Sequence, residues 1–223
     1  MSIAQNLQHI NSQLSGGITL VAVSKTKPNT LLMEAYEAGQ KDFGENYVQE
    51  LVGKYEQLPK DIRWHFIGHL QSNKVKYIAP FVHLIHGVES LNLLIEINKQ
   101  AAKNNRIIQF LFQIYIASEE TKFGLNFKEC EEILASKAYA ELKNVKLCGL
   151  MGMSSNTDNT SQIETEFKSL KAFSEALIQK NYPITTLSFG MSNDYQLAVA
   201  CGSNMIRVGS LIFGERNYKA SME

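Results

Sequence analysis

Lys25 follows an apolar, β-branched segment, Ile18–Ser24, in the sequence ITLVAVSKTKP. This composition is typical of a strand buried on both faces, and Pro28 cannot continue such a strand. A lysine at the end of a buried strand can extend its ammonium to water, and on this segment alone that structural role is the better supported. Burial also lowers the pKa of an ammonium group, and a neutral amine forms a Schiff base with an aldehyde. Lys25 therefore has two possible roles: a structural role at the end of the strand, and Schiff-base formation with a carbonyl compound.

Two later motifs, GMSND and RVGS, carry residue types that hold phosphate. Glycine lets the backbone approach an anion closely, and the hydroxyls of Ser192 and Ser210 lie beside N–H groups at predicted helix starts. Asp194 occupies a predicted helix N-cap. A buried Arg207 needs an acceptor, which a carboxylate or an aromatic ring nitrogen can provide. A Schiff-base lysine opposite a phosphate site suits pyridoxal 5′-phosphate (PLP), but it equally suits the substrate of a sugar-phosphate aldolase.

Eight predicted strands alternate with helices, and no linker or shift in composition separates them. Alternating β and α segments favour a parallel sheet, and eight units in 223 residues favour a closed TIM-type (β/α)8 barrel. An open doubly wound sheet is the alternative, but neither GxGxxG nor GxxxxGKS/T occurs. The predicted strands are Ile18–Lys25, Asp42–Asn46, Arg63–Gly68, Leu84–Glu89, Gln109–Ile116, Val145–Met153, Thr185–Met191 and Asn204–Ser210.

Apolar residues at helical spacing predict a helix within residues 1–17 that packs on the barrel. We expect residues 1–223 to form a single barrel domain. The other predicted helices are Leu31–Ala38, Tyr47–Gln57, Asn73–Ala79, Leu91–Lys103, Phe127–Ala138, Thr160–Lys180 and Asp194–Cys201.

The barrel would bring the candidate residues to one rim. Functional groups of such barrels lie at the carboxyl ends of the strands, with phosphate often held after strands seven and eight. Lys25 ends the first predicted strand and Asn46 the second, while Ser192 directly follows the seventh and Ser210 ends the eighth. The rim therefore pairs the lysine with the phosphate-binding motifs.

Composition limits the class of protein. The 22 basic residues balance the 22 acidic ones, and no block of like charges suggests a nucleic-acid partner. The N-terminus does not resemble a secretory signal, and no segment is long enough to span a membrane. The three cysteines are widely separated and odd in number, which indicates reduced thiols in a cytoplasmic protein.

The histidines do not suggest a metal site. His65 lies within a predicted strand, as a core or ring-stacking residue, and His69 lies at the rim. Neither has recognisable metal-ligand partners, and His9, His83 and His86 form no evident constellation.

Six segments resemble the pyridoxal phosphate homeostasis protein family, which includes the YggS-type proteins and the proline synthase co-transcribed homologue. The resemblance extends from about Leu20 to Tyr218, and the segment WHFIGHLQSNK is particularly specific. The segments are VAVSKTKP, FGENYVQE, WHFIGHLQSNK, GLMGM, SFGMSNDY and IRVGSLIFGERNY.

This resemblance implies a barrel similar to the N-terminal domain of alanine racemase. It also implies that PLP forms an internal aldimine with Lys25, that Arg207 faces the pyridine nitrogen, and that Asn46 lines the pocket near the ring. An arginine at that nitrogen keeps it unprotonated and weakens the ring as an electron sink. The residues implied to hold the phosphate are Ser192, Gly209 and Ser210.

Two positions depart from the family pattern. Gln113-Ile114-Tyr115 replaces the common QVN or QIN, and Gln196 replaces a common glutamate. The first change could alter the pocket floor, whereas neither touches the residues expected to anchor PLP.

The function implied is binding rather than catalysis. Alanine racemase uses a lysine and a tyrosine from a second domain, whereas this chain ends soon after its eighth predicted strand. Another donor, such as Tyr47, Tyr195 or a loop group, would have to replace that tyrosine. We therefore expect a monomeric protein that buffers or delivers PLP, maintains vitamin B6 and amino-acid homeostasis, and has PLP-dependent apo-enzymes as possible recipients. The alternative is a weak PLP-dependent amino-acid racemase. An aldolase is disfavoured because the motifs resemble those of the pyridoxal phosphate homeostasis protein family instead.

Overall fold

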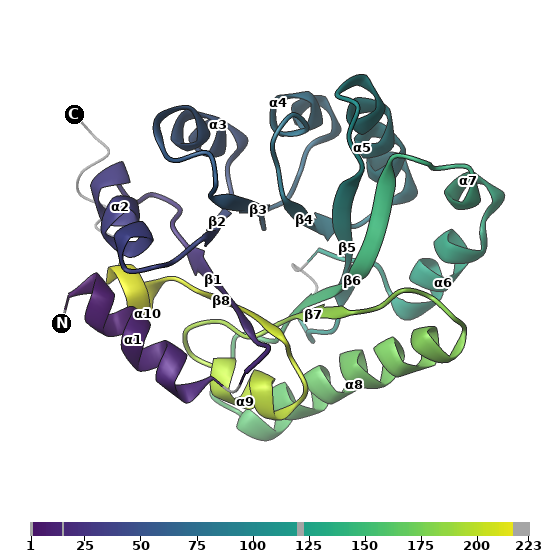
Figure 1. The fold of residues 1–223 in the computed structure, drawn as a ribbon. Coiled ribbons are helices and arrows are strands. Elements are labelled where there is room, and N and C mark those ends of the chain that lie inside the picture. Colours follow the sequence, from purple (N-terminus) through teal and green to yellow (C-terminus); the bar gives the residue numbers. More distant parts are fainter. Residues whose placement is uncertain (1, 15, 120–122, 216–223) are drawn as a thin grey trace.

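Eight parallel strands close into a barrel in the computed structural model, which describes residues 2–14, 16–119 and 123–215 (Figure 1). β1 pairs with β8 as well as with β2, and this pairing closes the sheet. The predicted (β/α)8 barrel is confirmed, and the open-sheet alternative is wrong. The strands are β1 (Thr19–Val23), β2 (Asp42–Glu45), β3 (Arg63–Phe66), β4 (Leu84–Val88), β5 (Ile108–Tyr115), β6 (Val145–Met153), β7 (Thr186–Ser188) and β8 (Met205–Val208).

Helices surround the barrel and connect successive strands (Figure 1). Two of them differ from prediction in more than their boundaries. The predicted helix over 127–138 breaks at Ser136, whose backbone is extended and whose side chain caps the following helix, and the predicted helix over 73–79 begins as a 3₁₀ turn, η1 (Ser72–Lys74). The helices are α1 (Ile3–Gln13), α2 (Asn29–Glu37), α3 (Val48–Gln57), α4 (Val75–Ile78), α5 (Leu91–Lys103), α6 (Phe127–Ala135), α7 (Lys137–Ala140), α8 (Thr160–Gln179), α9 (Tyr195–Ala200) and α10 (Ser210–Phe213).

The N-terminal helix α1 lies beside α2 and α10 (Figure 1). Its Asn6 amide donates to the carbonyl oxygen of Ile212 at 3.0 Å. This contact ties the helix to α10, the segment that follows β8. Within the described ranges, no helix combines the length and the apolar character that crossing a bilayer requires.

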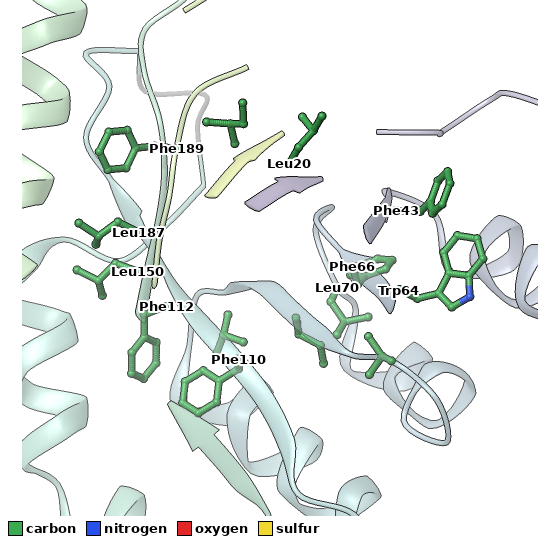
Figure 2. Close-up of a cluster of buried hydrophobic side chains, with 14 of the residues drawn as sticks. Leu20, Phe43, Trp64, Phe66, Leu70, Phe110, Phe112, Leu150, Leu187 and Phe189 are labelled. Carbon is green, nitrogen blue, oxygen red and sulfur yellow. The ribbon is translucent and has the colours of Figure 1, made fainter. Parts of the chain in front are cut away.

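The strands are buried on both faces, as their apolar composition predicted. One face packs against the helices through large side chains such as Phe43, Trp64 and Phe110 (Figure 2). Residues at alternate positions of the same strands form a second, smaller cluster. Because side chains alternate across a strand, that second cluster fills the barrel interior. Its members are Val21, Leu84, Leu111, Cys148, Met151 and Met205.

Candidate ligand site at the barrel mouth

A cavity of about 320 Å³ opens at the carboxyl ends of the strands. All six residues that the sequence suggested for a cofactor line it, although they come from four separate parts of the chain. They are Lys25, Asn46, Ser192, Arg207, Gly209 and Ser210. The barrel therefore brings together the candidate amine, the candidate phosphate-binding residues and a guanidinium group.

Lys25 lies in the loop after β1 and is half-buried. The strand ends at Val23, two residues earlier than the predicted boundary. Thr26 then takes a left-handed conformation with φ of 63°, and its N–H donates to Oε1 of Glu50 at 2.6 Å. The loop that carries Lys25 is thus fixed by a side chain of α3.

Lys54 of α3 also forms hydrogen bonds that fix this loop. Its buried Nζ donates to the carbonyl oxygen of Ser24 at 2.8 Å, to Oε1 of Glu45 at 2.8 Å and to Oε1 of Glu50 at 2.6 Å. Burial raises the pKa of Glu45 to about 7, and the charge of Lys54 opposes that rise. We call Lys54, Glu45, Glu50 and Ser24 the loop clamp.

The opposite wall is formed by the loops after β7 and β8. Oγ of Ser192 accepts a hydrogen bond of 3.3 Å from the N–H of Gly209, which joins the two loops. Asp194 occupies the N-cap position of α9, as predicted, but its carboxylate makes no capping bond and accepts instead from the N–H of Met191 at 2.5 Å and from Oγ of Ser154 at 2.8 Å. Asp194 therefore shapes the loop that carries Ser192.

Arg207 points into the barrel interior and lies at the floor of the cavity. It is 4% exposed and donates to the carbonyl oxygen and Oγ of Ser188, both at 2.7 Å, and to the carbonyl oxygen of Gly152 at 3.0 Å. Desolvation lowers its pKa to about 10, so the group remains cationic at neutral pH. A guanidinium has five N–H groups, and the bonds to described residues use three. Donors thus remain for a ligand in the cavity.

The other rim residues have structural contacts. His69 lies at the rim, as predicted, with Nδ1 2.8 Å from Oε1 of Glu89. Tyr115 donates to the carbonyl oxygen of Glu119 at 2.8 Å, and Gln196 donates to Oε1 of Gln13 at 2.8 Å. Neither departure from the family pattern is among the described residues that line the cavity.

Sequence reasoning missed the loop clamp and the role of His86. His86 hydrogen bonds to His65 inside the barrel, although the sequence suggested no constellation for it. The described residues contain no cluster of three or more side chains able to hold a metal ion.

The profile of a family described as "Alanine racemase, N-terminal domain" matches residues 1–217. A relative from Aquifex aeolicus (strain VF5), named pyridoxal phosphate homeostasis protein, is 40% identical over 201 residues, covering 89% of this chain and 87% of the relative. A relative of the same name from Escherichia coli (strain K12) is 39% identical over 232 residues, covering 97% of each chain. The chain belongs to the pyridoxal phosphate homeostasis protein family.

Solved structures agree with membership of the pyridoxal phosphate homeostasis protein family. PipY of Synechococcus elongatus PCC7942 without PLP has a TM-score of 0.90 and 34% identity, covering 96% of this chain and all of PipY, and the same protein with PLP bound has a TM-score of 0.87. An alanine racemase from Clostridium difficile 630 has a TM-score of 0.79 but only 15% identity, and the match covers 58% of the racemase chain. At that identity the racemase shows a shared fold alone.

The cavity of this pyridoxal phosphate homeostasis family member has the donor set that PLP needs. A lysine amine can meet an aldehyde, hydroxyl and backbone N–H groups can meet a phosphate, and a guanidinium can meet an aromatic nitrogen. Ser210 and Leu211 are the first two residues of α10, where backbone N–H groups have no acceptor within the helix. The residues fit the cofactor.

Proposed function

We propose that this protein binds PLP and buffers or delivers it, and thereby maintains vitamin B6 and amino-acid homeostasis. The observation that carries the proposal is the convergence of Lys25, Arg207 and the Ser192–Gly209–Ser210 wall on one cavity in a chain of this family. A related structure, that of PipY, is described with PLP bound. The proposal includes a single-domain, monomeric protein that acts in the cytoplasm.

Each cavity residue has a distinct part in this proposal. PLP supplies an electrophilic aldehyde, and Lys25 would hold it covalently as a Schiff base. Ser192, Gly209 and Ser210 would bind the phosphate through hydroxyl and backbone N–H groups. Arg207 would donate to the pyridine nitrogen, and Asn46 would line the pocket beside the ring. Because Arg207 remains cationic, it would keep that nitrogen unprotonated.

The surroundings of the cavity favour a carrier over a racemase. Racemisation requires a second proton-transfer group on the other face of the cofactor. The hydroxyl of Tyr195 donates to Gln13 at 2.5 Å, and Tyr47 is 59% exposed; neither is among the described residues that line the cavity. The relatives are named for PLP homeostasis. We infer that PLP-dependent apo-enzymes are the recipients of the bound cofactor.

Borohydride reduction of the protein with added PLP, followed by peptide mapping, tests the site. We expect a stable label on Lys25 and its loss in Lys25→Ala. Lys27→Met is the matched control because Lys27 lines the same cavity, and it should retain the label on Lys25. Absence of label, or label mainly on another lysine, would overturn the assignment. Robust interconversion of D- and L-amino acids that Lys25→Ala abolishes would overturn the non-catalytic part.

A further inference from the structure

A continuous line of polar side chains crosses the barrel interior below Arg207. Asp42, His65, His86, Ser188 and Arg207 come from five different strands, and all are buried. Each alternates along its strand with residues that face the helices, such as Trp64 and Phe66 on either side of His65. All five therefore point into the barrel.

Successive members of this line are within hydrogen-bonding distance. Nη1 of Arg207 lies 2.7 Å from Oγ of Ser188, which lies 3.1 Å from Nδ1 of His86. Nε2 of His86 lies 2.9 Å from Nδ1 of His65, and Nε2 of His65 lies 3.0 Å from Oδ1 of Asp42. We call these five residues the relay.

The two ends of the relay have fixed hydrogen-bonding roles. Arg207 can only donate and the Asp42 carboxylate can only accept. With neutral imidazoles, Ser188 accepts from Arg207 and donates to His86, which in turn donates to His65. Both histidines then carry their proton on Nε2, and no relay atom lacks a partner.

The relay shares the barrel interior with apolar side chains. The same interior holds the apolar cluster that includes Val21, Leu111 and Met151. Burial holds the pKa of His86 well below its usual range, so its ring is neutral at physiological pH. An unpaired polar group in such an interior lowers stability, which favours the fully connected arrangement.

At its far end the relay reaches the opposite face of the barrel. Arg63 donates from Nε to Oδ1 of Asp42 at 2.7 Å and forms a second bond to Oδ2, and its side chain is 48% exposed. The carboxylate of Asp42 is therefore held ionised and oriented at the amino ends of the strands. This anchors the accepting end of the relay far from the cavity.

We propose that His86 and His65 are positioning residues that act through Ser188 to fix the guanidinium of Arg207 for the pyridine nitrogen of PLP. This inference rests on the proposed function. Oγ of Ser188 lies 3.1 Å from Nδ1 of His86 and 2.7 Å from Nη1 of Arg207, so the bond to His86 holds the hydroxyl where it constrains the rotation of the guanidinium. Its remaining N–H donors then face the cavity in one arrangement.

His86→Leu removes both hydrogen bonds of the ring, whereas His86→Gln keeps one acceptor and one donor. We expect His86→Leu to weaken PLP binding about tenfold, near the upper end of what one typical hydrogen bond contributes, and His86→Gln to recover most of the loss. His83→Gln is the matched control because His83 lies 5.4 Å from the His65 ring, measured between centroids, but outside the relay. It should leave the affinity unchanged.

An analogue of PLP with carbon in place of the ring nitrogen separates positioning from general damage. The relay acts on the nitrogen, so His86→Leu should weaken PLP binding but hardly change the affinity for the analogue. Equal losses for both ligands in a variant with native circular dichroism would overturn the inference. If His86→Leu fails to fold, Ser188→Ala serves instead, since it breaks the relay but keeps the backbone bond to Arg207. A wild-type protein that binds neither ligand would defeat the proposed function, whereas unchanged PLP affinity in a folded variant would defeat the relay alone.

Discussion

Gly68 lies directly against the main chain of Asn46, which lines the cavity. A Cβ atom added at Gly68 would lie 2.3 Å from the carbonyl oxygen and 2.8 Å from the Cα of Asn46. Such contacts are with backbone, which cannot move aside as a flexible side chain can. Because Gly68 has no side chain, the backbone of Asn46 can approach it closely, and this contact positions Asn46 at the cavity.

Gly68→Ala should displace Asn46 and lower both stability and PLP retention. We expect a loss of about 1–3 kcal/mol in the free energy of unfolding, the usual cost of overpacking. Gly53→Ala is the control, because that helical position in α3 has nothing within 4 Å of the added Cβ and alanine favours a helix. Urea denaturation of both variants gives the comparison, and equal stability of the two would contradict this account.

At the scale of elements, α3 does more than cover the barrel. The loop clamp joins this helix to the end of β2 and to the loop that carries Lys25. Lys54 compensates two carboxylates, one of them buried, so its removal would leave charge without a partner. The position of α3 therefore helps to fix the position of the loop that carries Lys25.

Lys54→Met should destabilise the protein by about 3 kcal/mol, because it leaves Glu45 buried beside a second acid. It should also slow borohydride-trapped labelling of Lys25, since the loop loses its tie at Ser24. Lys128→Met is a suitable control, as Lys128 is 85% exposed in its pair with Glu132 and should change stability by no more than about 0.5 kcal/mol. Urea denaturation and labelling rates measure both effects. Wild-type behaviour of Lys54→Met in both assays would argue against the clamp.

The eight-strand pattern and the rim residues could be predicted because they depend on local sequence. Apolar runs mark the strands, and the order of the strands places Lys25 and Ser192 on one rim. The contacts of Asp194 and His86 could not be predicted, since both depend on partners from distant strands or loops. At Ser136 the backbone is extended rather than helical, and hydrophobic periodicity does not distinguish these two conformations.

At the scale of the whole molecule, two buried carboxyl groups respond to pH in opposite ways. Hydrogen bonds from His65 and Arg63 outweigh desolvation and lower the pKa of Asp42 to about 2. Desolvation dominates at Glu45 and raises its pKa to about 7. Asp42 therefore stabilises the fold above pH 3.8 and loses that contribution as pH falls toward about 2. The Glu45 contribution is present below pH 4.5 and is lost as pH rises through about 7.

Glu45→Gln should remove the pH response of Glu45 and leave that of Asp42. The amide keeps an acceptor for Ser24 and Lys54 but cannot ionise. In the wild type we expect the Glu45 contribution to make the free energy of unfolding fall between pH 4.5 and about 7, and in the variant that fall should be absent. Asp61→Asn is the control, because its pKa is lowered from 3.8 and its titration lies below this window. Urea midpoints measured across the window decide the matter, and parallel curves for wild type and Glu45→Gln would show that Glu45 does not titrate there.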